Sequence, residues 1–174
     1  VSARTVADPL HPARTASPPP TGPPAPAIPV NGPAVSEALA GAVRLRTIAD
    51  RKNPDASADQ FRRFHEFLAQ RFPRVHATLK RETVSNYSLL YTWEGTDKNA
   101  KPIALMAHQD VVPIAPGTES NWQEAPFDGI VKDGFVWGRG AWDDKSNLVS
   151  QLSGIGQVIT EGFQPRQTIY IALR

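Results

Sequence analysis

The chain has 174 residues, contains no cysteine and carries a formal net charge of +2 at pH 7. This length suits one domain, and a hydrophobic fraction of 40% is enough for a packed core. The small net charge does not favour binding to nucleic acid or to an anionic membrane surface. No stretch approaches the roughly 20 apolar residues that a membrane-spanning helix needs. Without cysteine, a metal site would have to be built from His, Asp and Glu.

Residues 1–33 differ in composition from the rest of the chain. Ten of the 17 prolines lie between Pro9 and Pro33, and Asp8 is the only acidic residue in this stretch. Such a segment cannot bury enough apolar surface to offset the entropy lost on ordering. We therefore expect a disordered, proline-rich arm that tethers or spaces a folded domain over residues 34–174. A peptide ligand for a proline-binding module is the alternative.

Two helices are expected at the start of the folded part. The first is predicted to begin near Ser36, since Val35, Leu39 and Val43 approximate helical spacing. The second covers residues 57–72, places its phenylalanines on one side and ends at Pro73. These phenylalanines are expected in the core.

The pattern then changes to strands and one further helix. The apolar run 102–107 (PIALMA) is typical of a strand that is buried on both faces. Strands and helices in this order predict an α/β domain with a mixed β-sheet flanked by helices. The expected elements are strands at 85–93, 102–107, 129–132, 135–137 and 168–173 and a helix at 144–161.

His108 and Asp110 directly follow one of the predicted strands. Two side chains separated by one residue project to the same side of an extended chain. This arrangement suits a metal-ligating His whose other ring nitrogen is held by a carboxylate. A lone His and Asp at a strand end are more often structural, and the pair alone leaves both interpretations open.

Asp143 and Asp144 lie between a predicted strand and a predicted helix. Two adjacent carboxylates repel each other unless a cation or a helix N-terminus compensates their charge. The pair could therefore bridge divalent cations, or one of the two could simply cap the helix. The sequence contains no G-x-S-x-G nucleophile motif, no H-E-x-x-H zinc motif and no phosphate-binding loop.

From about Val35 to Arg174 the chain resembles the M20 metallopeptidases, especially the carboxypeptidase S-like branch that includes N-acyl-amino-acid hydrolases. The motifs that carry this resemblance are MAHQDVVP (106–113), NWQEAPFDG (121–129) and DGFVWGRGAWDDK (133–145). Their order and separation also match the family. The resemblance implies the N-terminal portion of a di-zinc exopeptidase catalytic domain, which cleaves an amide bond next to a free carboxylate.

The resemblance also implies roles for individual residues. His108 would bind one zinc ion, and Asp110 would act in catalysis by orienting His108. Asp143 would bridge both metal ions, and the peptide bond between Asp143 and Asp144 is expected to be cis. One departure from many members is Ser146, where glycine is common.

Other parts of the family machinery are expected beyond Arg174. They are a Glu-Glu pair that supplies the general base and a ligand, a further acidic ligand, a His ligand and an inserted smaller domain. Zinc in catalytic sites usually has three protein ligands. We therefore expect the 174 residues alone to bind zinc weakly and to be inactive.

Two function classes remain open at this point. One is a zinc-dependent hydrolase that acts on short peptides or N-acyl amino acids, with homodimer formation through the inserted domain. The other is a non-catalytic homologue that serves as a binding protein, although the retained His108, Asp110 and Asp143 argue against it. The proline-rich arm and the branch resemblance lean toward an exported protein.

Overall fold

The computed structural model describes residues 29–174, in which three helices come first and strands follow, with one further long helix before the last strand. The arm predicted for residues 1–33 therefore lies almost wholly outside the described residues. The elements are α1 (Gly32–Arg44), α2 (Ala58–Arg71), α3 (Pro73–Thr78), β1 (Lys80–Val84), β2 (Ser88–Trp93), β3 (Ile103–Ala107), η1 (Glu119–Asn121), β4 (Ile130–Lys132), β5 (Phe135–Trp137), α4 (Lys145–Thr160) and β6 (Ile169–Leu173).

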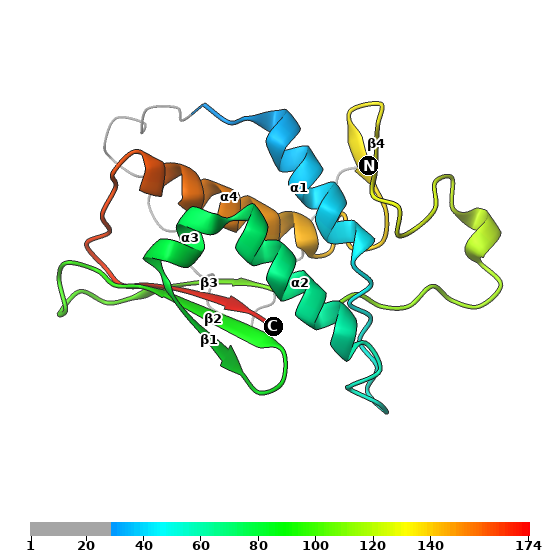
Figure 1. The fold of residues 1–174 in the computed structure, drawn as a ribbon, viewed down its shortest axis with the longest axis horizontal. Helices are drawn as coiled ribbons and strands as arrows, with labels where there is room; N and C mark the ends of the chain where they lie inside the picture. Colours follow the sequence, from blue (N-terminus) through cyan, green and yellow to red (C-terminus); the bar gives the residue numbers. More distant parts are fainter. Residues whose placement is uncertain (1–28) are drawn as a thin grey trace, which may run out of the picture. The chain divides into compact units, whose positions relative to one another are not determined.

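Four strands form a mixed sheet in the order β1-β2-β6-β3. Strand β6 pairs antiparallel with β2 and parallel with β3, and β1 pairs antiparallel with β2. Helices α2, α3 and α4 lie over one face of this sheet (Figure 1). The prediction of an α/β domain with a mixed sheet and flanking helices is confirmed.

The core lies between the helices and the sheet. Strands β2 and β6 contribute alternate side chains to it, because successive residues of a strand point to opposite faces. Phenylalanines of α2 pack against them, as the helical spacing predicted. The buried apolar cluster consists of Ala38, Ala42, Phe64, Leu68, Phe72, Val75, Leu79, Leu89, Tyr91, Trp93, Ala107, Leu148, Val149, Leu152, Ile155, Ile171 and Leu173.

Helix α1 begins earlier than the sequence predicted. The Asn31 side chain caps it by accepting a hydrogen bond from the Ala34 N–H at 3.1 Å, and Pro33 lies in the first turn. The predicted helix start at Ser36 was therefore too late. Pro33 has no N–H to lose in a first turn, so it favours the helix start here rather than marking the arm.

Two strand predictions were incomplete. Strand β1 was missed, because all five of its side chains are exposed and it shows no apolar alternation. Strand β3 was predicted to be buried on both faces, but it lies at the end of the described sheet and Met106 is 71% exposed. An apolar run by itself does not reveal how many neighbours a strand has. Likewise, Pro73 ends α2 as expected but also begins the short helix α3.

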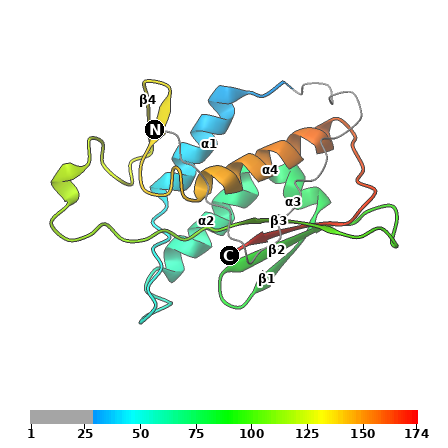
Figure 2. The same ribbon diagram turned by 180° about the vertical axis from the view of Figure 1, so that it is seen from behind.

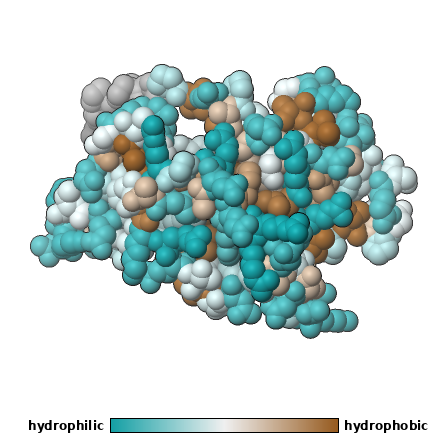
Figure 3. Space-filling model, in the orientation of Figure 1, coloured by the Kyte–Doolittle hydropathy of each residue, from teal (hydrophilic) through white to brown (hydrophobic). Residues whose placement is uncertain are grey.

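A long connection leads from β3 to the β4–β5 hairpin, and the part of it that contains η1 extends away from the helices and the sheet (Figure 2). Within residues 29–174, no helix is long and apolar enough to cross a bilayer. On the face shown in Figure 3, most residues are hydrophilic and apolar residues are interspersed among them.

Two glycines around β4 allow a test of how this hairpin is attached to α1. Both have positive φ, at 56° for Gly129 and 81° for Gly134. A Cβ at Gly129 would lie 2.3 Å from the Ala40 carbonyl oxygen, whereas a Cβ at Gly134 would have nothing within 4 Å. Gly134→Ala should therefore cost about 1–2 kcal/mol of stability, the ordinary penalty of a left-handed backbone. Gly129→Ala should cost about 1–3 kcal/mol more from overpacking.

Urea denaturation of both variants measures this difference. Equal losses of unfolding free energy would contradict the close approach between Gly129 and α1.

Candidate active site

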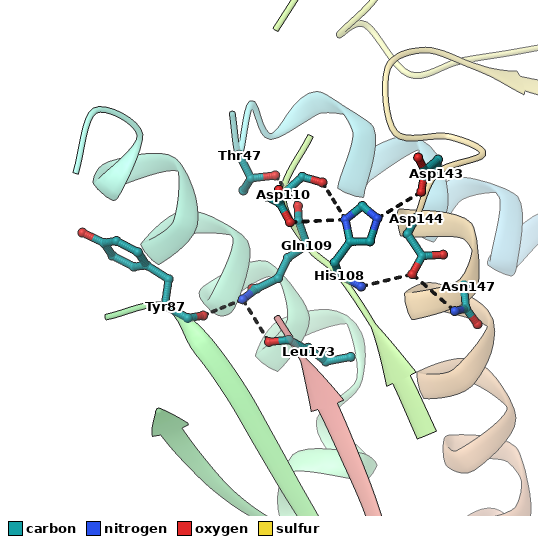
Figure 4. A network of polar contacts seen from close by, with 9 residues as sticks. All are labelled: Thr47, Tyr87, His108, Gln109, Asp110, Asp143, Asp144, Asn147 and Leu173. Carbon is teal, nitrogen blue, oxygen red and sulfur yellow. Dashed lines mark hydrogen bonds and ion pairs between the residues drawn. The ribbon is translucent and has the colours of Figure 1, made fainter. Parts of the chain in front are cut away.

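The imidazole of His108 lies between two carboxylates just beyond the C-terminal end of β3 (Figure 4). Its Nδ1 is 3.2 Å from Oδ1 of Asp110 and 3.0 Å from the backbone oxygen of the same residue. Its Nε2 is 3.0 Å from Oδ1 of Asp143. The structure thus brings together all three residues that the sequence singled out.

The loop between β5 and α4 supplies the second half of the site. The peptide bond between Asp143 and Asp144 is cis, as predicted. Oδ2 of Asp144 accepts hydrogen bonds from the His108 N–H at 3.1 Å and from Nδ2 of Asn147 at 3.3 Å. Asp144 occupies the N-cap position of α4, but its side chain makes no capping hydrogen bond. The Asp144 carboxylate therefore joins the two loops, and helix capping does not account for it.

The charges around His108 determine its protonation. Burial lowers the pKa of the imidazole, but the hydrogen bond with Asp143 and the nearby Asp110 outweigh burial and hold the pKa above its ordinary value. Both ring nitrogens then face oxygen acceptors. A proton and a divalent cation compete for Nε2, because only neutral imidazole binds metal.

The donor set fits part of a zinc site. Imidazole nitrogen and carboxylate oxygen are ordinary zinc ligands, and two such ligands on one tetrahedral zinc ion stand about 3.3 Å apart. The 3.0 Å separation between Nε2 of His108 and Oδ1 of Asp143 is close to that value. Asp110 fits the outer position, since it accepts from the other ring nitrogen and thereby fixes the ring.

The part of the chain described here does not complete a metal site. Within residues 29–174, no group of three His, Asp or Glu side chains is placed to hold one metal ion. His108 and Asp143 would supply two ligands, and Asp110 is engaged with Nδ1.

Lys145 is buried directly after the Asp pair. Its ammonium donates to the backbone oxygens of Ala42 at 2.9 Å and Leu45 at 2.6 Å, and it lies 5.0 Å from the centre of the Phe64 ring. Burial lowers the pKa of Lys145 to about 7. Lys145 thereby ties the Asp143–Asp144 loop to the C-terminal end of α1. Lys145 belongs to one of the motifs found in the sequence, but no role was predicted for it.

Polar side chains of α4 also support the site, and sequence reasoning missed them. Asn147 and Gln151 donate to the backbone oxygen of Met106 at 3.1 and 3.0 Å. They stand four residues apart, so they share one helix face. That spacing was the only available signal, and it could not show that the face meets β3. The hydroxyl of Ser146 donates to the Trp142 backbone oxygen at 2.7 Å.

Comparison with known proteins bears on this site. Residues 104–173 match the model of peptidase family M20/M25/M40, a range that includes His108 and Asp143. Carboxypeptidase S of Saccharomyces cerevisiae is 42% identical over 144 residues, which cover 79% of this chain and 25% of that protein. The N-fatty-acyl-amino acid synthase/hydrolase PM20D1 of Mus musculus is 37% identical over 145 residues, 80% of this chain and 27% of that protein.

Solved structures show the same fold at low sequence identity. Human carnosine dipeptidase 1 superposes with a TM-score of 0.67 at 17% identity, over 82% of this chain and 32% of that one. An M20 family metallo-carboxypeptidase from Sulfolobus solfataricus superposes with a TM-score of 0.63, over 80% of this chain and 30% of that one. The chain spans about a quarter of the length of the curated relatives it matches. The resemblance to the M20 peptidases and their carboxypeptidase S-like branch is confirmed.

Proposed function

From this similarity to peptidase family M20/M25/M40, we propose that the full-length protein is a metal-dependent hydrolase. It cleaves an amide bond next to a free carboxylate, in short peptides or in N-acyl amino acids. The observation that carries the proposal is the approach of His108 to Asp110 on one side and Asp143 on the other. Relatives named as carboxypeptidases and as N-fatty-acyl-amino acid synthase/hydrolases support both substrate classes.

Each residue of the site would have a separate role in binding the metal ions. His108 and Asp143 would hold zinc, since Nε2 of His108 and Oδ1 of Asp143 face each other at 3.0 Å. Asp110 accepts from Nδ1 and keeps the ring in the tautomer whose Nε2 is free to bind. Asp144 anchors the His108 backbone N–H, which joins the two loops. A bound pair of zinc ions would lower the pKa of a water molecule and polarise the scissile carbonyl.

The experiment measures amino acid release by the full-length protein from short peptides and from N-acyl amino acids. Chelation should abolish the activity, and added zinc should restore it. A matched substrate whose terminal carboxylate is amidated should react at least about 100-fold more slowly. A site that binds the carboxylate of its substrate is left with unpaired polar groups when that charge is removed. A protein that binds zinc but hydrolyses neither class would instead support the non-catalytic homologue.

Residues 1–174 expressed alone provide the complementary measurement. We expect no hydrolysis and only weak zinc binding, because two ligands fall short of the three that catalytic zinc usually has. Zinc-dependent amide hydrolysis by these residues alone would contradict this part of the proposal.

A further inference from the structure

Three polar side chains are fully buried within residues 29–174, and all of them contact the site or its flanking backbone. They are Thr47, Gln109 and Lys145, each with 0% exposure. A polar group is costly to bury unless its hydrogen bonds are made inside the protein. Lys145 anchors the Asp143–Asp144 loop, as described above. The other two act on the segment that carries His108 and Asp110.

Gln109 makes three hydrogen bonds with three different elements. Its Nε2 donates to the backbone oxygens of Tyr87, beside β2, and of Leu173 in β6, the latter at 3.3 Å. Its Oε1 is 3.0 Å from Nε2 of His65 in α2. Burial lowers the pKa of His65, which favours the neutral ring; that ring can donate through Nε2 to Oε1. The Gln109 amide is therefore satisfied in one orientation only.

Thr47 holds the same segment through its backbone. The Thr47 hydroxyl donates to the backbone oxygen of Gln109 at 2.5 Å, and the backbone oxygen of Thr47 accepts from the Val111 N–H at 2.9 Å. On the other side, the Gln109 N–H donates to the Arg174 oxygen at 2.8 Å. The backbone on either side of Asp110 is thus fixed from two directions.

The alternation of an extended chain links these contacts to the site. Residues 108 and 110 point to one side and residue 109 to the other. Figure 4 shows the Gln109 amide directed toward Tyr87 and Leu173, while the imidazole of His108 faces Asp143. A rotation of Gln109 out of its contacts would turn His108 and Asp110 together. Fixing Gln109 therefore fixes both functional side chains.

We propose that Gln109 and Thr47 are positioning residues that hold His108 and Asp110 in the geometry for binding metal. This inference rests on the proposed function, because it assigns the two residues to the same metal site. Neither residue touches the metal or the substrate. Loss of an outer partner of this kind typically weakens metal affinity or activity by about 10- to 100-fold.

The test measures zinc affinity of the full-length protein by competition with a chromophoric chelator, under conditions where every variant is folded. Thr47→Val removes the hydroxyl with little change in shape, and Thr47→Ser keeps it. Gln109→Leu removes all three side-chain hydrogen bonds. Val75→Ala, a buried position in α3, is the control for loss of stability alone.

We expect zinc affinity to fall about 10- to 100-fold in Gln109→Leu and Thr47→Val, and to be retained in Thr47→Ser and Val75→Ala. If Gln109→Leu does not fold, the comparison of Thr47→Val with Thr47→Ser decides the matter. Wild-type zinc affinity in Thr47→Val would overturn this inference, as would a loss in Val75→Ala equal to that in Thr47→Val. Either result would leave the proposed function standing. A wild-type protein that does not bind zinc would overturn the proposed function, and this inference with it.

Discussion

Replacing Asp143 by Ala should lower kcat/KM of the full-length protein by at least about 100-fold, the upper end of what loss of an outer partner costs. Asp143 faces Nε2 of His108 at 3.0 Å and is proposed to ligate both metal ions. Its removal therefore takes away a ligand and the charge that compensates the metal. The zinc content of the purified variant, measured together with kcat/KM, should fall in parallel.

Asp59→Ala is the matched control for this experiment. Asp59 is an exposed carboxylate in the first turn of α2, where it pairs with Arg63 at 2.9 Å. Surface pairs of this kind contribute about 0.2–1 kcal/mol, so activity and zinc content should stay at the wild-type level. An Asp143→Ala protein with full zinc content and full activity would remove Asp143 from the metal site.

Replacing Lys145 by Ala should destabilise the fold by about 3 kcal/mol or more. The side chain is fully buried, and its removal leaves a cavity of the kind that costs about 2–5 kcal/mol when a long side chain is cut to Ala. It also removes one hydrogen bond each from the oxygens of Ala42 and Leu45, which keep the backbone N–H groups of Leu45 and Thr47 as donors, at about 0.5–1.5 kcal/mol for each lost bond. Release of the buried ammonium from its desolvation offsets part of this loss.

Lys145→Met separates the two contributions, because it keeps the apolar stem and removes only the ammonium. Urea denaturation should rank the unfolding free energies as wild type, then Met, then Ala. Lys132→Ala removes a half-exposed lysine that pairs with Glu124, and it should have little effect. A Met variant as stable as the wild type would show that the ammonium costs as much to bury as its hydrogen bonds contribute.

Local patterns were sufficient for most of the fold. The phenylalanines of α2, the two strands of the β4–β5 hairpin and helix α4 all lie within one residue of where the sequence predicted them. The patterns failed where pairing decides the structure. The sequence of β1 (KRETV) has no apolar face, and only its antiparallel register with β2 makes it a strand.

The site divides in the same way. His108, Asp110 and Asp143 belong to motifs that can be identified by reading along the chain. Thr47 and His65 could not be found in this way, because they lie 62 and 44 residues from Gln109 in sequence. Their contacts depend on packing of α2 and on the bridge between Ile48 and Val111, neither of which has a local signature.

The contacts of Asn147 and Gln151 with β3 also connect helix α4 to the strand that carries the site. Ile103 and Ala107 direct their backbone groups toward β6, so the oxygen of Met106 points to the opposite side of β3. That oxygen already accepts from both amides of α4. Within residues 29–174, α4 is therefore tied to the strand end that carries His108 by two hydrogen bonds to a single backbone oxygen. A change in the position of α4 would move this strand end as well, so the helix and the site behave as one unit.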